Sequence, residues 1–282
     1  MTKKIELIAI DLDGTLLRDD KSLMEENIQA IHEAIEQGVR VVICTGRTLP
    51  SIEYILEKLP AGHGDDEYLI LQNGAVIHQL PSLDIIHETI LTPADRQLVY
   101  DTFMSLRRPQ VQLVGFDADS LYLIDDQEAN ETVHNDAKIL STPISYTPFE
   151  DVLALDTLYK FLAFGEVEHI DHLLDNLPES IYDQVHVVRS LPIAIEFIPK
   201  AANKANGLTA LLKELNIDKE NVMAIGDELN DLEMIDMVGL GVVMGNGHPE
   251  VKAVADYITL TNENDGVAHA IRHFVTKLPQ NS

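Results

Sequence analysis

The chain has 282 residues, of which 45% are hydrophobic, and it carries a formal net charge of −27. This length accommodates two domains, and this composition is typical of a globular protein in water. The negative charge disfavours binding to nucleic acid or to anionic membrane surfaces, and no apolar run is long enough to cross a bilayer. The single cysteine, Cys44, excludes an internal disulfide and fits a cytoplasmic location.

Two aspartates follow the first predicted strand. The run of residues 5–10 is apolar with one exception and predicts a short buried strand, which Asp11 and Asp13 follow directly. Residues two apart in an extended chain lie on the same side, so these carboxylates would repel each other unless a cation lay between them. Mg²⁺ suits such a site because it takes hard oxygen ligands. The alternative is an ordinary turn, since an aspartate followed by Gly14 is a common turn pair.

Strands and helices alternate over the next part of the chain. Their order, with strands that are apolar throughout, predicts a parallel sheet covered by helices on both faces. Ligands bind such sheets outside the carboxyl ends of the strands. The predicted elements are a helix over 24–37, a strand over 39–44 followed by Thr45, Gly46 and Arg47, a helix over 49–59, and a strand over 68–71 followed by Asn73 and Gly74.

The pattern changes after about residue 83 and returns near residue 195. Residues 84–194 contain alternating apolar and polar runs, which indicate half-exposed antiparallel strands, and an acidic helical stretch over 167–177. This region is predicted to be an inserted α+β domain. The first pattern then resumes with a helix over 208–215, a strand over 222–226 that ends in Asp227, a helix over 232–238, strands over 241–244 and 257–260, and a helix from Gly266.

The predicted strand ends carry the groups that phosphoryl transfer requires. A carboxylate can attack the phosphorus, a metal ion can neutralise charge, and hydroxyl, amide and ammonium groups can hold the phosphate oxygens. These groups are Asp11 and Asp13 after the first strand, Thr45 and Gly46 after the second, Asn73 after the third, Lys204 before the helix over 208–215, and Asp227, Asn230 and Asp231 after the strand over 222–226.

These ordered motifs resemble the haloacid dehalogenase (HAD) superfamily of phosphohydrolases. They read D-L-D-G-T-L-L, C-T-G-R, a lysine and G-D-E-L-N-D along the chain. The position of the insertion, with the later M-G-N-G and T-x-x-N-x-x-D-G-V-A segments, is similar to the Cof-type sugar-phosphatase branch. The resemblance implies a Rossmann-like catalytic core formed by residues 1–83 and 195–282. It also implies that residues 84–194 form a cap domain that determines substrate specificity.

The resemblance implies catalytic and metal-binding roles for four aspartates. Asp11 would be the nucleophile, and Asp13 would protonate the leaving alcohol and then activate the water that hydrolyses the aspartyl-phosphate. Mg²⁺ would be held by the Asp11 carboxylate, the backbone carbonyl of Asp13 and Asp227. Asp231 would bind the metal through water or support the ligands from behind.

Six further positions are expected to bind the phosphate or the substrate. By the same resemblance, Thr45 and the Gly46 N–H would donate to phosphate oxygens, Lys204 would neutralise phosphate charge and orient Asp11, and Asn230 would donate to the phosphate. Arg47 could contact the leaving group or cap its own helix. Asn73 could line the site or only form a turn.

The sequence therefore predicts a cytoplasmic, Mg²⁺-dependent phosphatase that acts on a small phosphorylated metabolite, with a sugar phosphate as the expected class. Two alternatives share the aspartyl-phosphate. A phosphosugar mutase would return the phosphate to a second hydroxyl, and a receiver-like switch would hold a phospho-aspartate without turnover. The pair of aspartates after the first strand, the G-D-E-L-N-D segment and the large insertion argue against the switch.

Overall fold

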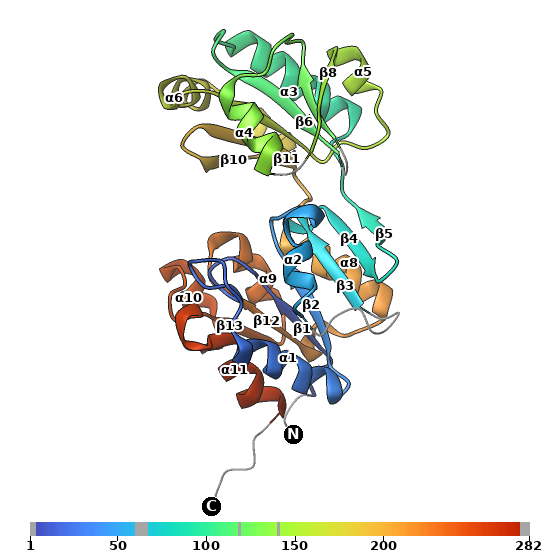
Figure 1. Ribbon diagram of the computed structural model, residues 1–282, viewed down its shortest axis with the longest axis vertical. Coiled ribbons are helices and arrows are strands. Elements are labelled where there is room, and N and C mark those ends of the chain that lie inside the picture. The colour runs from blue at the N-terminus through green and yellow to red at the C-terminus, as the bar shows by residue number, and fades with distance from the viewer. Residues whose placement is uncertain (1–3, 60–66, 118–119, 140–141, 277–282) are drawn as a thin grey trace, which may run out of the picture. The chain divides into compact units, whose positions relative to one another are not determined.

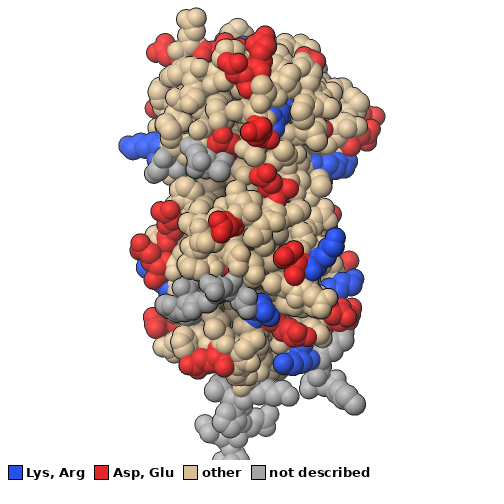
Figure 2. Space-filling model, turned by 90° about the vertical axis from the view of Figure 1, so that its right-hand side faces the viewer, with Lys and Arg blue, Asp and Glu red and all other residues tan. Residues whose placement is uncertain are grey.

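The computed structural model describes residues 4–59, 67–117, 120–139 and 142–276 (Figure 1). These residues form two compact units, one extending to Glu88 and resuming at Asn203, the other comprising Thr89–Ala202. Acidic side chains are scattered over the face shown in Figure 2 and do not gather into a single patch. Among the described helices, none has the length and apolar character needed to cross a membrane.

The first unit is built on an eight-stranded sheet in the order β14-β13-β12-β1-β2-β3-β4-β5. The strands from β14 to β3 are parallel, and β4 and β5 extend the sheet in antiparallel fashion. The direction in which the chain adds strands reverses between β1 and β12, as in Rossmann-type sheets. The strands are β1 (Leu7–Ile10), β2 (Arg40–Cys44), β3 (Glu67–Leu71), β4 (Val76–Leu80), β5 (Asp84–Glu88), β12 (Val222–Gly226), β13 (Leu240–Val243) and β14 (Tyr257–Ile258).

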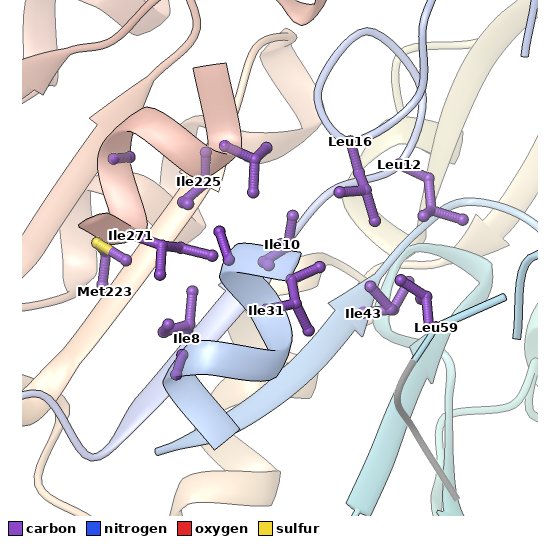
Figure 3. Close-up of a cluster of buried hydrophobic side chains, with 14 of the residues drawn as sticks. Ile8, Ile10, Leu12, Leu16, Ile31, Ile43, Leu59, Met223, Ile225 and Ile271 are labelled. Atoms are coloured by element: carbon purple, nitrogen blue, oxygen red, sulfur yellow. The ribbon is translucent and has the colours of Figure 1, made fainter. Parts of the chain in front are cut away.

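Helices cover both faces of this sheet because its central strands are apolar on both sides. Ile8 and Ile10 of β1 pack in one cluster with side chains of α1 and α11 (Figure 3), whereas Leu7 and Ala9 belong to a second cluster with α8, α9 and α10. Burying each such large side chain contributes about 1.5–3 kcal/mol. The helices of this unit are α1 (Glu25–Glu36), α2 (Glu53–Leu56), α8 (Lys204–Leu215), α9 (Leu232–Met237), α10 (Pro249–Val254) and α11 (Gly266–Ile271).

Most predicted elements of the first unit are confirmed, and one helix is not. The helix predicted over 24–37 and the strands predicted over 39–44 and 68–71 correspond to α1, β2 and β3. The helix predicted over 49–59 is wrong in extent, because the structure has a 3₁₀ turn over Leu49–Ser51 and only the short α2. Ile52, Ile55 and Leu59 are buried, but Pro50 lies in a tighter 3₁₀ turn at the start of the segment. The α-helical hydrogen bonds that follow are mixed with bonds between residues three apart.

The second unit is a six-stranded sheet in the order β10-β11-β9-β6-β7-β8, antiparallel except between β7 and β8. Apolar clusters lie on both faces, one under α3, α5, α6 and α7 and the other under α4. The predicted α+β character of the insert is confirmed. The elements are α3 (Pro93–Leu106), β6 (Gln112–Phe116), β7 (Leu121–Ile124), α4 (Glu131–Ile139), β8 (Ile144–Thr147), α5 (Phe149–Leu153), β9 (Lys160–Phe164), α6 (Val167–Asp175), α7 (Ile181–Gln184), β10 (Val185–Leu191) and β11 (Ala194–Pro199).

The boundaries of the insert differ from the predicted limits of residues 84–194. Residues 84–88 form β5, which pairs with β4, so they belong to the first unit. Residues 195–199 continue β11, which pairs with β9 and β10, so they belong to the second unit. Both shifts have the same cause, because a strand belongs to the unit whose sheet satisfies its backbone hydrogen bonds.

Candidate active site

A polar pocket of about 220 Å³ lies at the carboxyl ends of the parallel strands of the first unit. It is at the point where the strand order reverses, since Asp11 follows β1 and Asp227 follows β12. Open α/β sheets bind ligands at such a position. Seven residues line the pocket, namely Asp11, Asp13, Thr45, Gly46, Arg47, Glu228 and Asn230.

A buried lysine joins two of the predicted aspartates. Lys204 is 1% exposed, and its Nζ donates to Asp11 Oδ1 at 2.5 Å and to Asp231 Oδ1 at 2.6 Å. Its position follows from the helix start, because the Asn203 side chain accepts from the Asn206 N–H at 2.7 Å and caps α8. The helix begins at Lys204 itself, four residues before the predicted start at 208. Lys204 is therefore not a solvated surface lysine.

Asp231 supports its neighbours with both carboxylate oxygens. While Oδ1 accepts from Lys204, Oδ2 accepts from the backbone N–H groups of Asp227 at 2.9 Å and Glu228 at 3.1 Å. A fully buried carboxylate with these partners fixes the turn that carries Asp227. This arrangement favours the supporting role among the two roles expected for Asp231.

Asp227 is oriented by a hydroxyl group that the sequence interpretation gave no role. Thr15 Oγ1 donates to Asp227 Oδ1 at 2.7 Å. Gly14 lies at the same point, with φ of +82°, and a Cβ at this position would collide with the Asp227 carboxylate. The D-G-T sequence after the first strand therefore makes room for Asp227 and holds it.

Burial shifts the pKa values of two of the site's carboxyls, Asp11 and Asp227. Burial raises the pKa of Asp11 to about 8. The negative charges of Asp231 and Asp227 also raise it, whereas the Lys204 ammonium lowers it. Burial likewise raises the pKa of Asp227 to about 6, although the hydrogen bond from Thr15 acts in the opposite direction. Burial alone would lower the pKa of Lys204, but its two carboxylate partners outweigh this effect and raise it.

The same three aspartates form a group that could hold a metal ion. One carboxylate oxygen from each of Asp11, Asp227 and Asp231 lies within 4.8 Å of the others. Carboxylate oxygens are the ligands that Mg²⁺ prefers, and a divalent cation among them would favour the charged forms of Asp11 and Asp227, which burial disfavours. The residues present therefore fit a hard divalent cation.

Asp13 is held by two cations. Arg47 donates from Nε to Asp13 Oδ2 and from Nη2 to Oδ1, both at 2.7 Å, and Lys21 Nζ lies 2.8 Å from Oδ1. Burial alone would raise the pKa of Asp13, but the Arg47 and Lys21 bonds keep it below its usual value. Arg47 also lies 3.3 Å from the Tyr54 hydroxyl. In this structure, then, the short hydrogen bonds of Arg47 go to Asp13, and it makes only a long one, at 3.5 Å, to the Ser51 carbonyl of the following 3₁₀ turn.

A left-handed turn after β3 fastens the segment that contains Thr45 and Gly46. Gln72, Asn73 and Gly74 have φ values of +51°, +55° and +89°. The N–H groups of Gln72 and Asn73 donate to the Arg47 and Thr45 carbonyls at 3.0 Å and 2.9 Å. Position 74 must be glycine, because a Cβ there would overlap the Asn203 carbonyl. Asn73 therefore helps to hold the segment that contains Thr45 and Gly46, and it does more than form a turn.

Asn73 also contacts the other predicted amide of the site. Asn230 Nδ2 donates to Asn73 Oδ1 at 3.0 Å, and the Asn73 amide group packs against Gly46. Thr45 is buried, and its Oγ1 accepts from the Arg47 N–H at 3.2 Å. All ten residues predicted for the site thus lie around one pocket of the first unit.

Thr15 and Lys21 bind predicted site residues, and Glu228 lines the pocket, but none of the three received a role from the sequence. Thr15 stands inside the D-L-D-G-T-L-L motif, so its position next to the aspartates was an available signal. Lys21 lies in a polar loop, and its approach to Asp13 depends on a left-handed φ of +65° that no sequence pattern indicates in a non-glycine residue.

Comparisons with known proteins place the chain in a family of hydrolases. A family model for haloacid dehalogenase-like hydrolases matches residues 8–271. The 5-amino-6-(5-phospho-D-ribitylamino)uracil phosphatase YcsE of Bacillus subtilis is 35% identical over 96% of this chain and 96% of its own. The phosphatase YwpJ of Bacillus subtilis is 30% identical over 96% of this chain and 100% of its own. The crystal structure of a haloacid dehalogenase-like hydrolase from Bacteroides thetaiotaomicron has a TM-score of 0.79 to this chain. The two proteins are 30% identical, and the match covers 96% of this chain and 99% of the other.

The parallel sheet with an inserted domain places the chain in the α/β class. The chain belongs to the haloacid dehalogenase-like hydrolase family, and the predicted Cof-type resemblance is confirmed. Within this family it is a phosphatase.

Proposed function

We propose that the protein is a Mg²⁺-dependent phosphatase that hydrolyses small phosphate monoesters, mainly sugar phosphates, through an aspartyl-phosphate intermediate. The observation that carries the proposal is the buried contact between Lys204 and Asp11, beside Asp227, in a polar pocket. A carboxylate with one oxygen fixed by an ammonium group is oriented for attack by the other.

The first half-reaction transfers the phosphoryl group to Asp11. Its Oδ2 attacks the phosphorus while Lys204 holds Oδ1, and the bond between phosphorus and the ester oxygen breaks. Asp13 gives a proton to that oxygen, so the alcohol leaves uncharged. Because Arg47 and Lys21 now hold Asp13 as a carboxylate, the substrate must displace at least one of them before Asp13 carries this proton.

The second half-reaction regenerates the enzyme. The Asp13 carboxylate takes a proton from a water molecule, the water oxygen attacks the phosphorus, and the bond to Asp11 Oδ2 breaks. Inorganic phosphate leaves, and Asp11 is again a carboxylate held by Lys204. The Thr45 hydroxyl, the Gly46 N–H and the Asn230 amide are the proposed donors to the phosphate oxygens in both steps.

The bound metal would be held by Asp11, the backbone carbonyl of Asp13 and Asp227. When present, it supplies positive charge to the phosphate oxygens and lowers the pKa of the neighbouring carboxyls. Asp231 keeps Asp227 in place by accepting a hydrogen bond from the Asp227 backbone N–H.

Much of the substrate choice is proposed to reside in the second unit, over residues 89–202, because most polar groups of the pocket are taken up by the phosphate, the metal and the reacting atoms. The preference for sugar phosphates is supported by the YcsE relative, whose name specifies a phosphorylated ribityl chain as part of its substrate. A cytoplasmic location is proposed because the single cysteine, Cys44, is a buried free thiol.

The test is phosphate release from a panel of sugar phosphates and other monoesters, with Mg²⁺ and with a chelator. Wild type, Asp11→Asn and the control Asp236→Asn, an exposed aspartate of α9, are compared. We expect Mg²⁺-dependent release by wild type and the control, and a decrease of at least about 10³-fold in Asp11→Asn.

Full turnover by a folded Asp11→Asn protein would refute the nucleophile assignment. If phosphate were moved to a second hydroxyl of the sugar without release, the protein would be a mutase. If Asp11 became stably phosphorylated with no turnover, the site would be a switch.

A further inference from the structure

The lysine beside Asp13 is in excess of what that carboxylate needs. Arg47 already binds both Asp13 oxygens with two hydrogen bonds, and its single positive charge balances that of the carboxylate. Lys21 adds a second positive charge on Oδ1, at 2.8 Å. The chain has only 20 lysines and arginines against 47 acidic residues, so two cations on one carboxylate at the pocket edge are notable in this protein.

The loop that carries Lys21 is fastened in place. The Arg18 N–H donates to the Ser22 carbonyl at 3.0 Å and the Lys21 N–H to the Arg18 carbonyl at 2.9 Å, which closes a tight turn. The Arg18 side chain donates to Glu263, whose carboxylate also accepts from the Asp19 N–H. The turn thus presents Lys21 to Asp13 from a backbone fixed to a distant segment of the chain.

The Lys21 ammonium is also open to solvent. Its side chain is 54% exposed, against 21% for Arg47 and none for Lys204. Lys204 is enclosed by Asp11 and Asp231, and Arg47 has further partners in the Ser51 carbonyl and the Tyr54 hydroxyl. Among the three cations around the pocket, Lys21 is the one that a group on a substrate can reach at least cost.

We propose that Lys21 is a specificity residue that binds a second anionic group, a carboxylate or a second phosphate, on the leaving group of the substrate. The proposal rests on the function proposed above, in which the phosphoryl group itself is held by Thr45, Gly46 and Asn230, with positive charge from Lys204 and the metal. The leaving oxygen is next to Asp13, so an anion a few atoms further along the leaving group meets Lys21. The favoured substrates are phosphorylated sugar acids and bisphosphates over neutral polyol phosphates.

The test uses matched esters that differ only by a terminal carboxylate in place of a hydroxymethyl group. The pairs are 3-phosphoglycerate with glycerol 3-phosphate, and 6-phosphogluconate with sorbitol 6-phosphate. kcat/KM is measured for wild type, Lys21→Gln, Lys21→Arg and the control Lys213→Gln. Lys213 is an exposed residue of α8, about 13 Å along the helix from Lys204, and its replacement changes the net charge equally.

We expect wild type to prefer the acid of each pair. Lys21→Gln should lower kcat/KM for the acid about tenfold more than for the polyol, since one exposed charged contact is lost. Lys21→Arg should keep most of the preference, Lys213→Gln all of it, and added salt should weaken it. An equal decrease for both members, or no change in their ratio, would overturn the proposal, because Lys21 would then act only on Asp13 or not at all.

A binding measurement separates this proposal from the phosphatase mechanism. Calorimetric titration of the acid and the polyol into Asp11→Asn, with and without Lys21→Gln, needs no turnover. Tighter binding of the acid that disappears with Lys21→Gln supports the role of Lys21 even if wild type released no phosphate. Equal binding of acid and polyol refutes it even if wild type is an active phosphatase.

Discussion

Lys204 in the first unit and Arg96 in the second are both buried cations, each 1% exposed, but their partners differ. Lys204 contacts two carboxylates, which are themselves ionisable. Arg96 contacts backbone carbonyls, with Nε donating to Leu91 at 2.8 Å and Nη1 to Leu155 at 2.6 Å, close to the end of α5. Lys204 therefore belongs to a cluster of ionisable side chains, whereas Arg96 holds backbone segments of the second unit together.

The difference shows what each unit gains from burying charge. An ion pair among carboxylates at strand ends contributes little net stability, because removal from water offsets the attraction, but it leaves groups whose protonation can change. A guanidinium at the carboxyl end of a helix satisfies carbonyls that would otherwise lack donors. The chemistry is accordingly concentrated in the first unit, although both units contain buried charges.

The strongest test of this contrast replaces each buried cation by methionine. Lys204→Met should lower kcat at least about 100-fold, because Asp11 loses the group that orients it and the phosphate loses positive charge. It should also destabilise the protein by about 3–5 kcal/mol, since two buried carboxylates lose their partner. Steady-state kinetics with a small aryl phosphate and urea unfolding measure both effects.

The Arg96→Met variant is the matched comparison. It should lose a similar free energy of unfolding, about 3 kcal/mol, because several buried carbonyls lose their donor. Its kcat per folded molecule for the small aryl phosphate should stay within about twofold of wild type. A decrease in kcat as large as that of Lys204→Met would show that the contrast between the two units is wrong.

The metal-free protein should become less stable as pH rises, because of its buried carboxyls. The folded-state pKa values of Asp227 and Asp11 are raised to about 6 and about 8, so the folded form binds more protons than the unfolded form above pH 4. This stabilisation is complete below the unfolded value of 3.8 and is lost as pH rises through about 6 and then about 8.

The measurement is the Tm of metal-free wild type and Asp11→Asn between pH 5 and 9. The Tm of wild type should fall relative to Asp11→Asn by roughly 8 °C or more, and saturating Mg²⁺ should remove the difference in slope. Parallel curves for the two metal-free proteins would mean that Asp11 does not titrate in this range.

The smallest expected effect concerns the turn after β3. Asn73→Ala places an alanine at φ +55° and removes the amide that accepts from Asn230, so it should destabilise the protein by about 1–2 kcal/mol. Asn73→Gly removes the same amide without the backbone cost and should be less destabilising. Both should raise KM several-fold, and a KM unchanged in both variants would limit Asn73 to a structural turn.

The strand ends of the first unit could be predicted because their signal is local. Apolar runs over residues 5–10, 39–44 and 222–226 end abruptly in polar residues, and this fixes a strand end closely. The order of the parallel strands then brings Asp11, Thr45 and Asp227 to one edge. Local pattern and sheet topology together therefore account for most of the candidate site.

Other features depend on contacts that a local pattern does not contain. The edge strand β5 is largely exposed on both faces, so it lacks the alternation that would have placed it in the first unit. Its partner β4 alone decides its membership. The bidentate binding of Asp13 by Arg47 depends on two strand ends meeting in space, and the additional contact of Lys21 depends on a left-handed turn. None of these is encoded in spacing along the chain.

The separation of β1 and β12 in sequence has a consequence for synthesis on the ribosome. Asp11 and Lys204 are 193 positions apart, with the whole second unit between them. At about 5–20 residues per second, translation makes the nucleophile about 10–40 s before the lysine that orients it. During that interval β1 lacks its neighbour β12, and the nascent chain has an incomplete sheet and no catalytic centre. Activity therefore begins only after the second unit has been synthesised, so the inserted domain can fold before the catalytic centre is complete.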